Sequence, residues 1–313
     1  CGTPWTEEHP EWFLGERQPG ANLLFNLGDP DARHFLTEFI SNFIRDVGID
    51  CYRQDFNFEP LPYWRAADAP DRQGMTEIRY VEGHYQFWDD LLRRHPGLLI
   101  DNCASGGRRI DLETISRSIP LWRSDYQCNP GFDPAGCQTQ THGLSYWVPL
   151  HGCGTCGGTH DPRRGDTYNV RSNLSASLEF PIYFNQGDGR EDHPWDWQRR
   201  MIEEYRRARP LFYGDYYPLT ADTGAADLWV AMQFHRPDLG EGMLLAFRRQ
   251  DSPFVTADFR LHALDPDATY ELTDADTGRK RRAKGRELTE KGLSVVMKTA
   301  PASRLVFYRR AEK

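Results

Sequence analysis

The sequence has 313 residues, with 38 Lys or Arg against 46 Asp or Glu, so its formal charge is −8. This acidic balance argues against a nucleic-acid-binding protein, because neutralising phosphates requires a basic face. Hydrophobic residues make up 39% and charged residues 27% of the chain, which is typical of a folded globular protein, and no stretch approaches the roughly 20 apolar residues of a membrane-spanning helix.

The first strong pattern predicts a helix that begins after Asp29 and ends at Gly48. Asp29 suits the N-cap, Pro30 suits the first helical position, and Gly48 suits the C-terminal stop. Apolar residues recur between them at helical spacing, namely Phe35, Leu36, Phe39, Ile40, Phe43 and Ile44. A strand-like run follows at 49–52, and polar residues come directly after it.

The order of helix, strand and polar cluster then recurs. A second helix is predicted from the in-phase apolar residues Ile78, Val81, Tyr85, Trp88, Leu91 and Leu92. It precedes a strand at 98–101, and a short helix near 112–118 precedes a strand at 121–124. Weaker strand signals lie at 146–148 and 178–184. Polar residues at the carboxyl ends of alternating strands are typical of a parallel α/β barrel. A doubly wound sheet is disfavoured because no strand is followed by a glycine-rich phosphate loop.

The pattern changes from about residue 222 onward. Alternating apolar runs are separated there by Asp-Pro and Asp-Thr-Gly turns, which predicts an antiparallel β domain at the C-terminus.

Two acids follow separate predicted strands and have aromatic neighbours. Asp55 lies next to Phe56, and Asp125 lies next to Tyr126. Two carboxylates that face one pocket are what glycoside cleavage requires; in the retaining version their carboxyl groups lie about 5 to 5.5 Å apart. The alternative is that each Asp caps a helix or pairs with Arg53 or Arg123.

Three strings carry a family resemblance. They are YRQDFN at 52–57, IDNCASGGR at 100–108 and LWRSD at 121–125. In order and spacing they resemble three successive motifs of the glycoside hydrolase family 36 α-galactosidases. The resemblance implies a retaining, exo-acting hydrolase that releases terminal α-linked galactose through a covalent glycosyl-Asp intermediate, with Asp55 as the nucleophile and Asp125 as the general acid/base.

The same resemblance implies a set of sugar-binding residues: Arg53, Asn57, Cys103, Gly106 and Trp122. Arg53 stands where the family usually has Lys, which keeps the charge but changes the donor geometry. Two members of the set have simpler interpretations. Gly106 suits a loop that needs a positive φ, and Trp122 suits the core.

The implied fold is a (β/α)₈ TIM-type barrel followed by an antiparallel C-terminal β-sandwich. The resemblance places the barrel region at 1–218, with only about five βα units and without its first strands, and the β domain at 219–313. A fragment of a longer protein is therefore expected. The sequence departs from the family at Tyr126, where a second Asp is common, and near Gly20, where Arg17 is the nearest candidate for a sugar-holding Arg. These departures affect substrate identity more than reaction type.

Other functions stay open at this point. Within the family, the alternatives are an α-N-acetylgalactosaminidase or a galactosyl transglycosylase; from another class, the alternative is a non-catalytic sugar-binding fragment. The expected partner is an oligosaccharide or glycoside, with no nucleic acid and no membrane. A homo-oligomer is left open, and so is the compartment, with the cytoplasm slightly favoured over secretion.

The seven cysteines are predicted to be mostly free thiols, because the number is odd and the chain is large enough to build its own core. Cys153 and Cys156 have C-x-x-C spacing and His160 follows, which raises the alternative of a zinc or redox site. A structural zinc site usually shows a second ligand pair, and the glycines here favour a loop. We therefore predict no metal and no cofactor.

Overall fold

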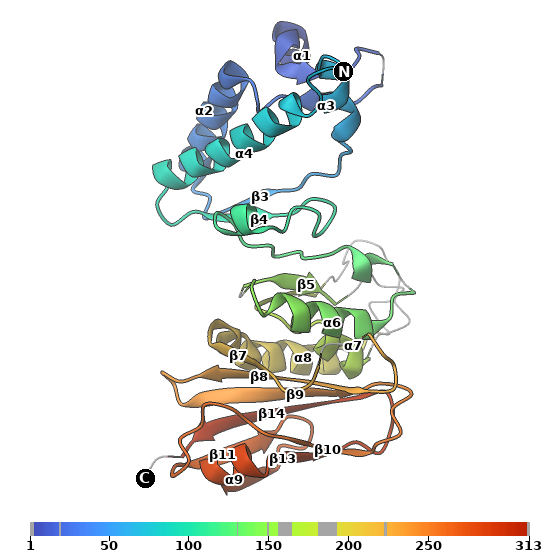
Figure 1. The fold of residues 1–313 in the computed structure, drawn as a ribbon. Coiled ribbons are helices and arrows are strands. Elements are labelled where there is room, and N and C mark those ends of the chain that lie inside the picture. The colour runs from blue at the N-terminus through green and yellow to red at the C-terminus, as the bar shows by residue number, and fades with distance from the viewer. Residues whose placement is uncertain are drawn as a thin grey trace. The chain divides into compact units, whose positions relative to one another are not determined.

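The computed structural model describes residues 3–18, 20–129, 131–148, 150–155, 165–180, 193–221 and 224–311. The chain divides into two compact units, Cys1–Pro120 and Leu121–Lys313, and each is described by itself (Figure 1). Within the described ranges, no helix combines the length and the apolar character that crossing a bilayer requires.

The first unit packs helices against a two-stranded parallel sheet. Strand β3 (Cys51–Gln54) runs parallel to β4 (Leu99–Asn102). Helices α2 (Pro30–Val47) and α4 (Met75–Arg94) lie over one face of this sheet (Figure 1). The remaining elements are α1 (Pro4–Glu8), the 3-10 helix η1 (Pro10–Trp12), β1 (Phe13–Leu14), β2 (Leu24–Phe25), α3 (Leu61–Ala67) and α5 (Leu112–Ile115). The predicted helix–strand order is thus confirmed in this unit.

The ends of α2 are those that the sequence predicts. The Asp29 side chain accepts hydrogen bonds from the backbone N–H groups of Asp31 and Ala32, both at 2.9 Å, and Pro30 is the first helical residue. Gly48 ends the helix with φ at +77°. Side chains are rarely tolerated at this backbone angle, so glycine is the natural residue at the stop.

The buried face of α2 differs from the prediction. Phe39 and Phe43 are 45% and 52% exposed, whereas Thr37 and Ser41 are buried. The two small polar side chains allow close helix packing because their hydroxyl groups find partners. Thr37 donates to the Arg33 carbonyl at 2.8 Å, and the Ser41 hydroxyl lies 2.8 Å from a ring nitrogen of His95.

Helix α4 supplies large apolar side chains to the core of the first unit. Its buried residues include Phe87, Trp88 and Leu91, which pack with Ile44 of α2 and Ile100 of β4. The Trp88 indole N–H donates to the Gln54 side-chain oxygen at 2.6 Å. This bond fixes α4 against the end of β3.

His84, on the same helix, is expected to make the stability of the protein depend on pH. Burial, together with the charges of Arg109 and Arg117, lowers the pKa of His84 from 6.5 to about 3. At a pH between these two values, His84 is therefore protonated in the unfolded chain and neutral in the folded chain. Stability should fall as pH drops below 6.5, by about 1.4 kcal/mol per pH unit down to the folded pKa.

Urea unfolding at several pH values tests this expectation. The wild type should lose more stability between pH 6.5 and 4.5 than His84→Phe, which has no titrating ring at this position. Equal pH slopes in the two proteins would contradict it.

The second unit begins with short helices and a two-stranded parallel sheet. Strand β5 (Gly152–Gly154) runs parallel to β6 (Ser177–Glu179). The helices are η2 (Tyr126–Cys128), α6 (Pro134–Leu144), α7 (Thr167–Ser172), α8 (Trp195–Ala208) and η3 (Arg209–Tyr213).

A six-stranded antiparallel sheet forms the rest of the unit, in the order β12-β11-β14-β9-β8-β7. Its strands are β7 (Asp215–Pro218), β8 (Trp229–Arg236), β9 (Glu241–Arg248), β11 (Thr269–Asp274), β12 (Lys280–Lys284) and β14 (Ala302–Arg310). The antiparallel character predicted for this region is confirmed.

Each face of the large sheet has its own cover (Figure 1). Helices α7 and α8 pack on one face, where Val170 of α7 and Met201 of α8 share an apolar cluster with Val230 and Phe234 of β8. The other face is covered by α9 (Gly285–Glu290) and by the antiparallel pair of β10 (Thr256–Phe259) and β13 (Leu293–Val296).

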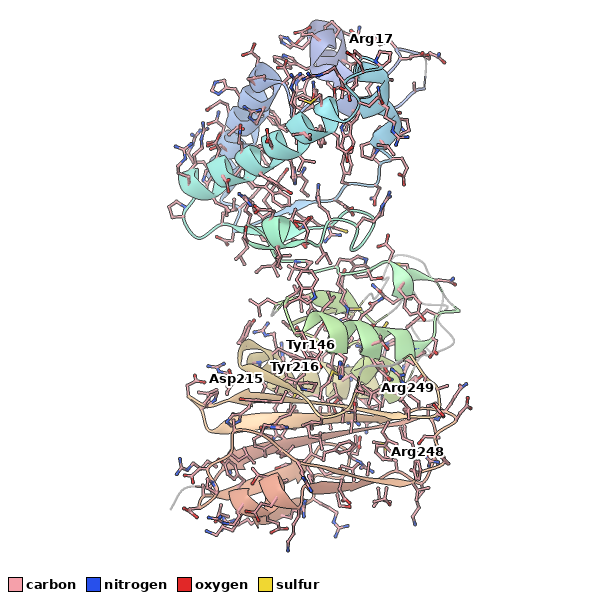
Figure 2. The ribbon with its side chains drawn as sticks, viewed as in Figure 1. Arg17, Tyr146, Asp215, Tyr216, Arg248 and Arg249 are labelled. Carbon is pink, nitrogen blue, oxygen red and sulfur yellow. The ribbon has the colours of Figure 1, made fainter. Side chains whose placement is uncertain are left out.

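Two consecutive arginines bond to opposite layers of this unit (Figure 2). Arg249, just after β9, donates to the Thr139 hydroxyl of α6 at 3.0 Å and to the Ala225 carbonyl at 2.8 Å. Arg248 donates to the Met297 carbonyl, which follows β13, at 2.8 Å. Both side chains are buried, so the end of β9 ties the helical layer to the small antiparallel pair.

Two predicted strands are wrong. Residues 121–124 form no strand: 121 and 122 are bends, and 123 and 124 are irregular. Pro120 precedes them and offers no N–H for a ladder, and the Arg123 N–H donates to the Gly152 carbonyl at 3.0 Å. Residues 146–148 follow α6 in a helical turn, where the N–H of Val148 donates to the Leu144 carbonyl at 2.7 Å. The signal at 178–184 corresponds to β6 in its first residues, and 181–184 lie outside the described residues.

Candidate functional site

Asp55 directly follows β3, at the carboxyl end of the strand. Its side chain is 38% exposed and lies 3.4 Å from the Arg53 guanidinium. One residue, Gln54, lies between Arg53 and Asp55, so in an extended chain the side chains of Arg53 and Asp55 point to the same side.

Arg53 also bonds to an acid that the sequence analysis missed. Its guanidinium donates to Asp101 of β4 at 2.5 Å, and Asp101 is only 5% exposed. Arg53 and Asp101 are directly opposite in the parallel register of β3 and β4. Pairing the two predicted strands in register would therefore have identified Asp101. The guanidinium links the buried Asp101 to the half-exposed Asp55.

Cys103 and Asn57 complete the surroundings of Asp55. Both side chains lie near the Asp55 carboxylate and lower its pKa. Cys103 is 2% exposed, and its backbone N–H donates to the Gln54 carbonyl at 3.1 Å. The Ser105 hydroxyl, also absent from the predicted set, donates to the Asn57 side-chain oxygen at 3.1 Å.

These contacts favour the ionised form of Asp55. Burial by itself raises the pKa of Asp55, but the hydrogen bond from Cys103, the charge of Arg53 and the hydrogen bond from Asn57 outweigh it and hold that pKa below its ordinary value of 3.8. Asp55 is therefore a carboxylate near neutral pH.

The loop after β4 has the backbone shape that the sequence predicts at Gly106. Gly106 has φ at +75°, and Ser105 has φ at +44°, which is unusual for a residue with a side chain. The N–H of Ala104 donates to the Gly106 carbonyl at 3.0 Å. This tight turn holds Cys103 and Ser105 next to Asp55 and Asn57.

Asp125 and Trp122 lie together in the second unit. The Trp122 indole N–H donates to the Asp125 carboxylate at 2.9 Å. Asp125 is exposed and immediately precedes η2. A Cβ at Gly154 would come within 2.5 Å of the Trp122 ring, so the glycine of β5 makes room for this indole. Trp122 thus holds the Asp125 carboxylate in place.

Arg123 has other partners than Asp125. It is 3% exposed, its guanidinium lies 3.0 Å from a ring nitrogen of His151, and it donates to the Cys137 carbonyl at 3.0 Å. The sequence suggested ion pairs of Asp55 with Arg53 and of Asp125 with Arg123. The structure contains the first of them.

The structure therefore gathers five of the seven predicted site residues in the first unit and two in the second. Arg53, Asp55, Asn57, Cys103 and Gly106 belong to Cys1–Pro120, and Trp122 and Asp125 belong to Leu121–Lys313. Arg17, the candidate for an additional sugar-holding Arg, is exposed between β1 and β2 (Figure 2).

Within the described ranges, Cys51, Cys103, Cys128 and Cys153 are free thiols. The thiol of Cys153 is buried and donates to the Asn173 side chain at 3.1 Å. Cys156 and His160, the other members of the zinc alternative, lie outside the described residues. Across the residues that are described, no three His, Cys, Asp or Glu side chains are grouped so that they could hold a metal ion.

Residues 4–212, two thirds of the chain, match the melibiase family. The chain belongs to this family. Alpha-galactosidase AgaA of Geobacillus stearothermophilus is 24% identical to this melibiase-family chain over 275 residues, which cover 85% of the chain and 37% of the relative. Alpha-galactosidase C of Emericella nidulans is 26% identical over 316 residues, which cover 97% of the chain and 39% of the relative. The melibiase-family chain thus spans about two fifths of the length of these relatives.

Solved structures share its fold. A variant of AgaA in complex with stachyose matches with a TM-score of 0.77 at 20% identity, over 99% of this chain and 43% of the other. The alpha-galactosidase of Lactobacillus brevis matches with a TM-score of 0.77 at 18% identity, also over 99% of this chain. The melibiase-family chain therefore has the fold of the matched part of these α-galactosidases, whose catalytic domain is of the TIM-barrel type.

Proposed function

We propose that this chain carries the catalytic residues of a retaining exo-glycoside hydrolase that releases terminal α-linked galactose. The observation that carries the proposal is the ionised Asp55 at the carboxyl end of β3, held by Arg53, Asn57 and Cys103. A carboxylate in this state is suited to attack an anomeric carbon. Membership of the melibiase family and the names of its relatives support galactose as the sugar.

In this proposal the Asp55 oxygen forms a bond to C1 while the bond from C1 to the leaving oxygen breaks. Asp125 gives its proton to the leaving oxygen and then takes one from the water that releases galactose from Asp55. Trp122 holds the Asp125 carboxylate for both steps. Arg53 and Asn57 bind sugar hydroxyls, and Cys103 and Gly106 shape the wall next to the sugar.

The finer assignment of the fold belongs to the same proposal. The barrel region is 1–218, with about five βα units, and the C-terminal β-sandwich is 219–313. The support for a sandwich is that β10, β13 and α9 cover one face of the six-stranded sheet.

The sugar and the reaction can be tested directly. Hydrolysis of 4-nitrophenyl α-galactoside should exceed hydrolysis of the α-N-acetylgalactosaminide, and proton NMR should show that α-galactose is the first product. Faster cleavage of the acetamido sugar, transfer of galactose to an added sugar in preference to water, or galactose binding without turnover would each contradict the proposal.

Asp125→Ala should slow the reaction in a way that depends on the leaving group. Raffinose needs a proton on its leaving oxygen, so we expect its kcat/KM to fall by roughly 10²- to 10⁴-fold. The loss for 4-nitrophenyl α-galactoside should be smaller, because nitrophenolate leaves without a proton. Initial rates with both substrates measure the difference. Asp196→Ala, at a 98% exposed carboxylate, is the control, and equal losses on both substrates would count against Asp125 as the acid.

Cys103→Ala should move the acidic limb of the pH–rate profile. The nucleophile must be ionised, and the thiol helps to lower the pKa of Asp55. Without the thiol that pKa rises, so the pH at which kcat/KM falls to half on the acidic side should also rise. A profile measured from pH 3 to 7 tests this, and a limb that stays in place or moves to lower pH would contradict it.

A further inference from the structure

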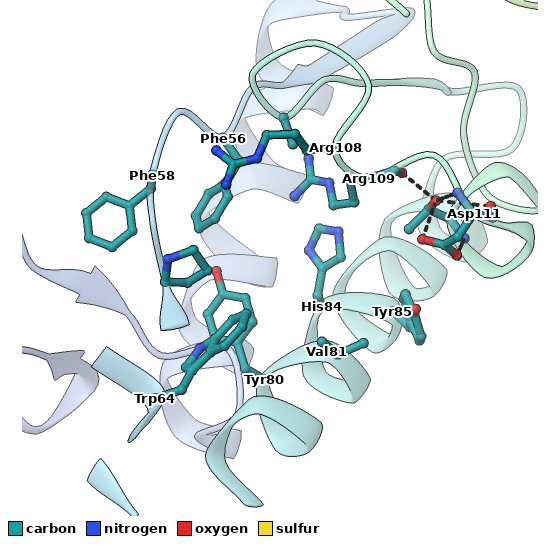
Figure 3. Close-up of a pocket in the computed structure, with 13 residues that line it drawn as sticks. Phe56, Phe58, Trp64, Tyr80, Val81, His84, Tyr85, Arg108, Arg109 and Asp111 are labelled. Atoms are coloured by element: carbon teal, nitrogen blue, oxygen red, sulfur yellow. Dashed lines mark hydrogen bonds between the residues drawn. The ribbon is translucent and has the colours of Figure 1, made fainter. Parts of the chain in front are cut away.

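The first unit contains a pocket that the proposed reaction does not use. We call it the aromatic pocket (Figure 3). Its volume is about 230 Å³. The loop after β3 contributes Phe56 and Phe58, α3 contributes Trp64, and α4 contributes Tyr80 and His84. All of these elements belong to Cys1–Pro120.

The walls of the aromatic pocket are suited to a flat apolar molecule. The ring of Tyr80 lies 5.2 Å from that of Trp64 and 6.5 Å from that of Phe56, measured between centroids. An apolar cavity of about 150 Å³ is large enough to bind benzene. The aromatic pocket therefore has room for one six-membered ring with a small substituent.

His84 supplies unused hydrogen-bonding capacity. It is 4% exposed, and neither of its ring nitrogens has a hydrogen-bond partner among the described residues. Figure 3 shows the imidazole turned into the cavity, toward the side where Arg109 lies. Buried polar groups are normally paired, so an unpaired imidazole on a cavity wall needs an explanation. Folding has already removed both ring nitrogens from water. A ligand hydroxyl that reaches one of them therefore forms a hydrogen bond without a further cost for desolvating that nitrogen.

The charged residues around the cavity are already engaged. Arg109 donates to the Asn102 side chain at 2.8 Å and to the Gln54 and Cys103 carbonyls at 3.0 Å. The Asp111 carboxylate accepts two backbone N–H groups at the start of α5. Arg108 pairs with Glu59 at 2.6 Å. Because burying a carboxylate is costly unless donors are free to receive it, these engagements disfavour an anionic guest.

We propose that the aromatic pocket is a binding site for a small neutral aromatic alcohol of the phenol class, whose hydroxyl hydrogen-bonds to His84. The site differs from the proposed sugar site, although Phe56 is the direct neighbour of Asp55 in the chain. Binding therefore does not require turnover, and it can be measured independently of whether the protein hydrolyses galactosides.

The test is a titration of the whole chain with phenol, toluene and benzoate, followed by ligand-observed NMR. Phenol should bind about tenfold more tightly than toluene, the effect of one added hydrogen bond, and more tightly than benzoate. In His84→Phe the preference for phenol over toluene should disappear. Val81→Trp, on the pocket wall, should weaken both phenol and toluene at least tenfold. Ile78→Trp, at a 53% exposed position on the same helix, should change neither.

Far-UV circular dichroism and unfolding midpoints establish that the variants are folded. If His84→Phe fails to fold, Val81→Trp still decides whether the pocket is the site. Phenol binding that survives Val81→Trp would overturn the proposal, and so would a phenol preference that survives His84→Phe. Tighter binding of benzoate than of phenol would also overturn it, since it would make Arg109 the recognition group.

Discussion

Asp55→Ala is expected to lower kcat for 4-nitrophenyl α-galactoside by a factor on the order of 10⁴. The substitution removes the atom that would form the covalent bond to C1, and nothing adjacent replaces it: Asn57 is neutral and Arg53 is a cation. Stopped assays with high enzyme concentration measure the residual rate. Sodium azide should restore part of the activity, because the small anion can enter the space of the missing carboxylate and attack C1 itself. The product would then be β-galactosyl azide.

Glu59→Ala provides a matched control for Asp55→Ala. Glu59 is an exposed acid on the same loop whose partner is Arg108, so its removal should leave kcat close to the wild-type value. Unfolding midpoints of the two variants separate a chemical loss from a structural one. An Asp55→Ala protein that keeps wild-type turnover would refute the nucleophile assignment.

Arg171→Ala is expected to lower the free energy of unfolding by about 3–5 kcal/mol. The Arg171 side chain is 1% exposed and bonds to Glu204 at 2.7 Å and to Asp276 at 2.7 Å. Glu204 is itself only 9% exposed, so losing the arginine leaves a buried carboxylate without its cation. Urea unfolding near pH 7, followed by circular dichroism, gives the difference.

Arg199→Ala is the surface counterpart. Arg199 pairs with Asp196 at 2.7 Å, but the two side chains are 71% and 98% exposed. Water screens such a pair, so the substitution should lower the free energy of unfolding by less than about 1 kcal/mol. Similar losses for the two variants would mean that burial does not control the strength of the Arg171 ion pairs.

Local chemistry explains which parts of the structure could be predicted. Asp29, Pro30 and Gly48 fix the ends of α2 through contacts and backbone angles within the segment itself, so their effect is visible in the sequence. Arg53, Asp55 and Asn57 alternate along one extended segment, so their grouping follows from the period of a strand. The positive φ expected at Gly106 is likewise a local property.

Features that depend on neighbouring elements were harder to predict. Asp101 joins the site only because β4 pairs with β3 in one register. The apolar stripe of α2 suggests burial of Phe39 and Phe43, but the helix packs through Thr37 and Ser41, whose hydroxyls are satisfied locally. His84 lies on α4, but its place on the wall of the aromatic pocket depends on side chains from α3 and from the loops after β3 and β4.

Some strand signals failed for a related reason. Residues 121–124 and 146–148 have strand-like composition, yet a strand also needs a partner along its length. Pro120 removes one ladder donor before the first run, and the hydrogen bonds of α6 continue into the second. Composition alone does not record either constraint.

The large sheet shares an apolar layer with α7 and α8, through Val170 and Met201 on the helices and Val230 on the sheet. A protease that cut the connection between β7 and β8 would accordingly yield two polypeptides that stay associated in one particle under native conditions. Expression of either polypeptide alone would expose its half of this apolar layer to water and favour aggregation.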